Sequence, residues 1–145
     1  MRSRLATLTA ATFVVLLAGP IGVHAQATQD TTMLPAAMRT ARAGLNAALT
    51  SLKASEAAGF FADSAVAEFQ GQTFPGKAAI EAWLTDALGG ISGIRFTNAK
   101  FTVSPTEIIE TSDYTVVTPD GEQPGATETT WRLVNGTWKV VRLRS

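Results

Sequence analysis

The C-terminal third of this chain is composed almost entirely of strand and turn signals, and this feature constrains its fold most strongly. Apolar and polar residues alternate there with the two-residue period of a β-strand. Pro119, Asp120 and Gly121 favour a turn, and Asn135-Gly136 is the pair typical of two-residue hairpins. The alternation slips between residues 98 and 100, which indicates a bulge. We therefore expect a meander of four antiparallel strands, at residues 94–103, 106–118, 127–134 and 138–144.

The preceding segment favours helices, with one strand among them. Apolar residues keep a helical spacing from Ala36 to Leu52, where alanine is frequent, and again over residues 77–88. A shorter helix is expected at residues 56–62, a strand at 64–70, and a turn-rich connection at 71–76. Helices followed by antiparallel strands are typical of an α+β fold. The helices would cover one face of a strongly bent antiparallel sheet that encloses an apolar pocket.

Residues 1–25 have the pattern of a secretory signal peptide. Arg2 and Arg4 precede an apolar run of about 14 residues, against the roughly 20 that span a bilayer, so we favour a cleaved signal over an uncleaved anchor. Small residues then follow at the spacing that signal peptidase recognises. We expect cleavage after Ala25 or Ala27, a flexible tail over residues 26–35 and one domain over residues 36–145. The protein would be exported, periplasmic or secreted, with no membrane contact after processing.

The composition excludes several classes of function. The chain has no cysteine, so disulfides, thiolate-bound metals and cysteine nucleophiles are impossible. Its net charge is zero, and we expect no nucleic-acid partner because such proteins carry a basic excess. The single histidine, His24, lies in the predicted signal peptide. Cleavage would leave no histidine for a metal site or a catalytic triad, and we expect neither metal nor cofactor.

Three stretches of the sequence, residues 60–66, 75–80 and 131–141, together resemble the nuclear transport factor 2-like superfamily, in its SnoaL-like and ketosteroid-isomerase-like branches. The resemblance covers the chain from about Met38 to the C-terminus. It implies a cone-shaped α+β barrel. It does not imply a reaction, because the superfamily contains isomerases, cyclases, dehydratases and epoxide hydrolases as well as binding and assembly domains that have no catalytic activity.

Glu68 is the candidate catalytic residue that the resemblance implies. Ketosteroid isomerases carry their general base five residues after the aspartate that opens the first strand, and counting from Asp63 gives Glu68. Their oxyanion donors have no equivalent here, because the first-helix position falls near Gly44 or Leu45 and the late-strand position near Thr129. Glu68 could instead contact a ligand, pair with an internal arginine such as Arg95, or be structural. Its role in the pocket requires that it face inward with Val66.

The strand and helix patterns also predict which side chains face the pocket. The candidate ligand-binding residues are Val66, Ile80, Trp83, Leu84, Tyr114, Thr129, Trp131 and Leu143. The alternative is that these side chains fill the interior as core. The direction of Tyr114 stays open, because it depends on where the bulge falls.

We favour a binding or assembly domain without turnover that holds a small apolar ligand. The alternative is a SnoaL-like or ketosteroid-isomerase-like enzyme, an isomerase, cyclase or hydrolase that uses Glu68 as general acid or base on a hydrophobic substrate.

The outer face of the sheet is expected to mediate a homodimer, as the resemblance implies. Strand alternation places a row of polar and charged residues there: Glu128, Thr130, Arg132, Arg142 and Arg144. Reciprocal ion pairs could then form across a two-fold axis. Because exposed ion pairs are weak, the dimer would also need apolar packing, for which Trp138 and Val140 are candidates.

Overall fold

The computed structural model describes residues 30–145, so the predicted signal peptide and its cleavage sites lie outside the described residues. These residues form the elements α1 (Ala36–Thr50), α2 (Ala54–Ala58), β1 (Phe61–Phe69), β2 (Gln72–Pro75), α3 (Lys77–Gly89), β3 (Gly93–Val103), β4 (Glu107–Thr118), β5 (Gly121–Val134) and β6 (Thr137–Arg144). Within residues 30–145, no helix has the length and apolar character needed to cross a membrane.

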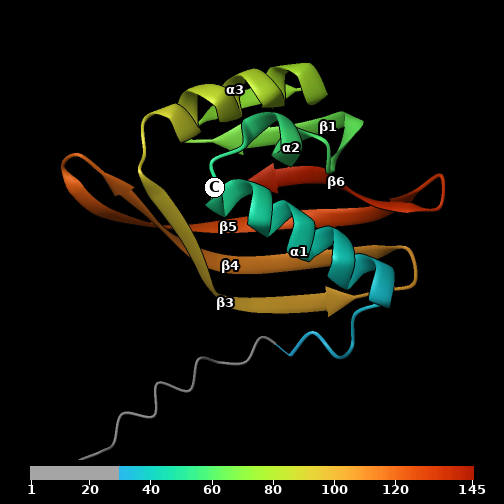
Figure 1. Cartoon of the computed structure of the whole chain (residues 1–145). Coiled ribbons are helices and arrows are strands. Elements are labelled where there is room, and N and C mark those ends of the chain that lie inside the picture. The colour runs from blue at the N-terminus through green and yellow to red at the C-terminus, as the bar shows by residue number, and fades with distance from the viewer. Residues whose placement is uncertain (1–29) are drawn as a thin grey trace, which may run out of the picture.

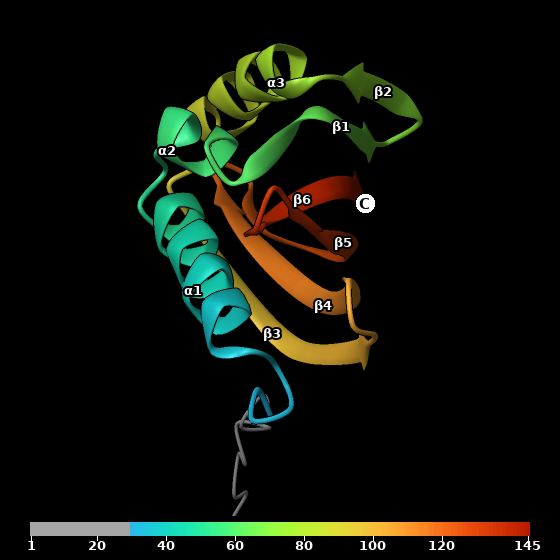
Figure 2. The same cartoon turned by 90° about the vertical axis from the view of Figure 1, so that its right-hand side faces the viewer.

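The strands form one open sheet in the order β2-β1-β6-β5-β4-β3. The helices lie in front of this sheet in Figure 1, and the side view in Figure 2 shows them all on one side of the curving strands. This arrangement confirms the predicted α+β fold. One pairing differs from the antiparallel sheet that we expected, because β1 and β6 are parallel and the sheet is therefore mixed.

The element boundaries differ most from the prediction at three places. The expected connection at residues 71–76 contains strand β2, because Gln70 and Gly71 take positive φ angles of 49° and 78° and reverse the chain onto β1. Pro75 is compatible with this strand, since β2 lies at the sheet edge. The second helix begins at Ala54 and ends at Ala58, four residues before the predicted end at residue 62, and residues 61 and 62 belong to β1. Strand β5 begins at Gly121, six residues before the expected start at residue 127.

The hydrophobic core lies between the helices and the inner face of the sheet. Met38, Ile80 and Trp131 have no exposed surface. On α3, Ile80, Leu84 and Leu88 are buried at four-residue spacing, which confirms the predicted apolar stripe of that helix. These side chains fix α3 over β1 and β2, at the top of the molecule in Figure 1.

The packed domain begins before α1. Leu34 is only 2% exposed and belongs to the core, and the Arg39 guanidinium donates a hydrogen bond to its carbonyl oxygen at 3.0 Å. Leu34, which falls within the segment predicted as a tail, is therefore part of the packed domain.

Two irregularities in strand pairing decide which side chains face inward. The β3–β4 register shifts between Thr97 and Lys100, where Asn98 has a φ of 55°, and this confirms the predicted bulge. The β5–β6 register shifts where Trp131 pairs with Val140 and Thr130 pairs with Arg142. The extra residue on β6 lies between these pairs.

Candidate functional site

A cavity of about 410 Å³ lies between the helices and the inner face of the sheet. Its walls are mainly apolar and include side chains from α1, α3, β3 and β6: Leu45, Leu49, Trp83, Leu84, Phe96 and Leu143. The size and the apolar lining are typical of small-molecule sites. The cavity is therefore the candidate functional site.

A row of polar residues crosses one wall of this cavity. Glu110 and Ser112 alternate on β4 and so share a face, and Thr129 pairs with Glu110 from β5. These three residues are between 6% and 7% exposed. The cavity therefore has apolar walls on most sides and a buried polar wall on the sheet.

Glu110 is held in place by two donors. Arg42 of α1 donates from Nε to its Oε1 at 2.7 Å, and the Trp131 indole donates to its Oε2 at 3.2 Å. The Arg42 guanidinium also lies 5.1 Å from the centre of the Phe101 ring. Both side chains of the ion pair are about nine-tenths buried, so their mutual attraction offsets part of the cost of burying each charge.

The local sequence patterns do not identify this ion pair, although one of them points to Arg42. Arg42 lies on the buried stripe of α1 with Met38, Leu45 and Ala48, at the spacing of a helix face that packs on the core. An arginine at such a position needs a buried anion. The sequence does not identify that anion, because Glu110 is 68 positions away.

Tyr114 faces the cavity, which settles the question that the sequence left open. Its ring lies across Gly125, its partner on β5, so closely that a Cβ on Gly125 would be 2.1 Å from the Tyr114 Cζ. The Tyr114 hydroxyl is 2.9 Å from the Ser145 hydroxyl. The glycine thus makes the space that this tyrosine occupies.

Aromatic rings pack together at the end of the cavity near α3. Trp83 stacks on Phe74 with ring centres 5.2 Å apart, and its ring centre is 5.6 Å from that of Phe69. Phe69 and Trp83 both line the cavity. Ring pairs of this kind are worth about 0.5–1.5 kcal/mol beyond the area they bury, so these contacts help to hold Trp83 against β1 and β2.

The prediction that Glu68 and Val66 face the pocket is wrong. Ala65 and Ala67 are the fully buried residues of this part of β1, and strand alternation turns Val66 and Glu68 to the other face. Glu68 does not line the apolar cavity. The expectation failed because an alternating strand has two possible phases, and the small alanines are the residues that fit beneath the helices.

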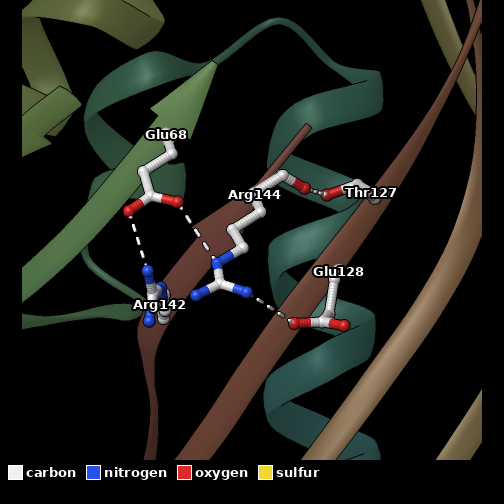
Figure 3. Close-up of polar contacts among 5 residues, drawn as sticks. All are labelled: Glu68, Thr127, Glu128, Arg142 and Arg144. Atoms are coloured by element: carbon white, nitrogen blue, oxygen red, sulfur yellow. Dashed lines mark hydrogen bonds and ion pairs between the residues drawn. The ribbon is translucent and has the colours of Figure 1, made fainter. Parts of the chain in front are cut away.

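Figure 3 shows the environment of Glu68 on the outer face of the sheet. One carboxylate oxygen accepts a hydrogen bond from Arg142 at 2.8 Å, and the other lies 3.2 Å from Arg144 Nε. Arg144 also lies 3.8 Å from Glu128. The arginine that we considered as a partner, Arg95, pairs instead with Glu122. These contacts make Glu68 part of a surface ion-pair cluster.

The structure divides the candidate ligand-binding residues into two groups. Five of them line the cavity: Trp83, Leu84, Tyr114, Thr129 and Leu143. Ile80 and Trp131 do not, because both are fully buried in the core beside it. Val66 does not, because it lies on the outer face with Glu68.

The outer face of the sheet forms an open hollow of about 920 Å³. Its charged lining includes Glu68, Glu128, Arg144 and Lys100. Trp138 and Val140, which we expected to supply apolar packing on this face, are 5% and 0% exposed and belong to the core. That part of the dimer prediction is wrong, because the β5–β6 register turns both side chains inward.

No three side chains of the kinds that bind metals come together in the part of the chain that the structure describes.

Comparison with known proteins identifies one family. The family model of the SnoaL-like domain matches residues 41–142. No curated protein matches the chain.

Solved structures of low sequence identity share the fold. A protein of unknown function from Pseudomonas putida KT2440, described as NTF2-like, has a TM-score of 0.66 and 16% identity over 74% of this chain and 81% of its own. An NTF2-like protein from Novosphingobium aromaticivorans has a TM-score of 0.61 and 19% identity over 74% and 77%. A protein of unknown function from Nostoc punctiforme, with a cystatin-like fold, has a TM-score of 0.62 and 16% identity over 74% and 85%.

Proposed function

This chain belongs to the SnoaL-like domain family, and we propose that it is an exported binding domain that holds a small apolar molecule in its central cavity without converting it. The observation that carries the proposal is the apolar cavity of about 410 Å³ beneath α1 and α3. If each non-hydrogen atom takes about the 30 Å³ that one molecule occupies in liquid water, the cavity has room for roughly a dozen such atoms.

The chemistry of the cavity wall supports binding more than turnover. Glu68, the predicted acid or base, lies on the opposite face in contact with Arg142 and Arg144. The carboxylate on the wall is Glu110, and each of its oxygens accepts a hydrogen bond from the protein. The alternative is an enzyme that uses Glu68 as acid or base, and none of the contacts of Glu68 favours it.

Two matched variants of α3, in each of which leucine replaces an alanine, test the proposal. Ala87 lines the cavity, whereas Ala82 is exposed on the same helix. Leucine at residue 87 would fill part of the cavity, and leucine at residue 82 would not. We expect 1-methylnaphthalene, measured by isothermal titration calorimetry, to bind the wild type and Ala82→Leu equally and Ala87→Leu at least tenfold more weakly. Equal binding to both variants, or no binding to the wild type, would overturn the proposal.

Export belongs to the same proposal and rests on the pattern of residues 1–25. The intact mass of the protein purified from its native envelope should correspond to a chain that begins at Gln26 or at Thr28. A mass that includes residues 1–25 would refute cleavage.

Self-association through the outer face is the third part of the proposal. Acidic and basic side chains lie side by side there, as Glu128 and Arg144 do, so two copies related by a two-fold axis could exchange ion pairs. Sedimentation equilibrium should give a dimer at micromolar concentrations, and Glu128→Arg should shift the protein to monomer. A wild-type protein that sediments as a monomer throughout this range would contradict this part.

A further inference from the structure

We infer that the molecule held in the cavity is apolar but carries a head group that donates hydrogen bonds, a hydroxyl or a protonated amine, which binds at Glu110, Ser112 and Thr129. This inference rests on the proposed function and names the class of ligand. It follows from three observations about the walls: the sign of their charge, the acceptors that they offer, and the position of their aromatic rings.

The charge of the wall disfavours anionic ligands. Among the described residues that line the cavity, Glu110 is the one charged side chain. Its cationic partner Arg42 does not line the cavity. A carboxylate or phosphate head group would therefore come to rest against an acidic side chain, with no cation on the wall to compensate it. Burial of an anion without such a partner is strongly unfavourable.

The hydrogen-bonding capacity of the wall favours a donor. A carboxylate offers about four acceptor positions, and Arg42 and Trp131 supply one hydrogen bond to each oxygen of Glu110. The hydroxyls of Ser112 and Thr129 lie next to it on the same face and can accept as well as donate. A ligand hydroxyl or ammonium placed against this row would donate hydrogen bonds to these buried acceptors.

The rest of the cavity favours an apolar, ring-containing body. Phe69, Trp83, Phe96 and Tyr114 all line it, and they come from four different elements. Aromatic faces also attract a cation, so an amine head group is compatible with these walls. The cavity thus offers apolar and aromatic surface to a ring and a buried polar row on β4 and β5 to a head group, which predicts an amphipathic molecule.

A set of naphthalene derivatives of similar size tests the inference. The probes are 1-naphthalenemethanol, 1-naphthalenemethylamine, 1-naphthoate and 1-methylnaphthalene, measured by isothermal titration calorimetry at neutral pH. A hydrogen bond to a charged group contributes about 1.5–3 kcal/mol, so we expect the methanol or the methylamine to bind roughly 10- to 100-fold more tightly than 1-methylnaphthalene. We expect 1-naphthoate to bind more weakly than 1-methylnaphthalene.

Two sets of variants locate the effect at the polar wall. Thr129→Val removes the wall hydroxyl with little change of shape, and Thr130→Val is the matched control on the outer face of the same strand. The first should reduce the preference for the alcohol over 1-methylnaphthalene at least threefold, and the second should leave it unchanged. The double variant Arg42→Met/Glu110→Gln removes both buried charges together, so neither remains uncompensated, and it should weaken the discrimination against 1-naphthoate. Circular dichroism and thermal unfolding establish that each variant is folded.

The outcomes separate this inference from the proposed function. If 1-methylnaphthalene binds but 1-naphthoate binds as tightly as the alcohol, the cavity is a binding site and the inference is wrong. If the alcohol is preferred and Thr129→Val does not change that preference, the inference is also wrong. If 1-methylnaphthalene does not bind the wild type, the proposed function fails, and the inference fails with it.

Discussion

Replacement of Gly125 by alanine should destabilise the protein through a single contact with Tyr114. The added Cβ would lie 2.1 Å from Cζ and 2.3 Å from the hydroxyl oxygen of Tyr114. Gly125 is not among the residues with positive φ, so alanine fits the backbone and the cost comes from the contact alone. The tyrosine ring must move, and it would lose its hydrogen bond to Ser145.

The size of this effect follows from the geometry. Overpacking of a closely packed site costs about 1–3 kcal/mol, and we expect Gly125→Ala to lower the free energy of unfolding by that amount. Tyr114→Leu removes the ring atoms that the Cβ would meet. In that background, Gly125→Ala should be neutral or stabilising by up to about 1 kcal/mol, because alanine restricts the unfolded chain more than glycine does.

Urea denaturation of the four proteins in this double-mutant cycle measures the coupling between the two positions. Since small domains have m-values of about 1–3 kcal/mol per molar urea, a loss of 2 kcal/mol shifts the midpoint by about 1 M. Tyr114→Phe is an additional control, because it keeps the ring and removes only the hydroxyl. The reasoning is refuted if Gly125→Ala costs the same in the wild type and in Tyr114→Leu, or if it costs nothing in the wild type.

Three further predictions concern ion pairs. Glu110→Gln should lower the free energy of unfolding by about 3–5 kcal/mol, because it removes one charge of a buried ion pair. Arg42→Met/Glu110→Gln should recover part of that loss in urea denaturation, and an equal loss in both variants would contradict this account. Glu68→Gln should cost only about 0–1 kcal/mol, because Glu68 and its arginine partners are partly open to solvent. Binding of 1-methylnaphthalene should be unchanged in calorimetry; a lost binding signal would show that Glu68 contributes to the cavity. The hydrogen bond from Arg95 and its positive charge lower the pKa of Glu122 below its ordinary value of 4.5. The pair therefore stabilises the fold above that pH and ceases to do so as the pH falls through the lowered pKa. An NMR titration should show the low pKa, and a value unchanged in Arg95→Gln would refute the assignment.

Local patterns in the sequence were sufficient to predict the type and order of most elements. The stripe of Ile80, Leu84 and Leu88 identified α3, because a helix that packs on a core must repeat its apolar residues every three to four positions. Asn135-Gly136 identified the last hairpin, where both residues take positive φ angles of 50° and 80°. These features depend on residues close together in the chain, so they are readable without any tertiary contact.

The phase of β1 and the polar wall of the cavity were decided by tertiary structure alone. The alternation around Glu68 is compatible with either face, and the packing of Ala65 and Ala67 beneath the helices selected one of them. Glu110 is one of several carboxylates on its strand, and its role comes from Arg42, which the fold brings to it from 68 positions away. A buried charge requires a partner, but the sequence does not say which distant residue will be adjacent, because that depends on how α1 lies across the sheet.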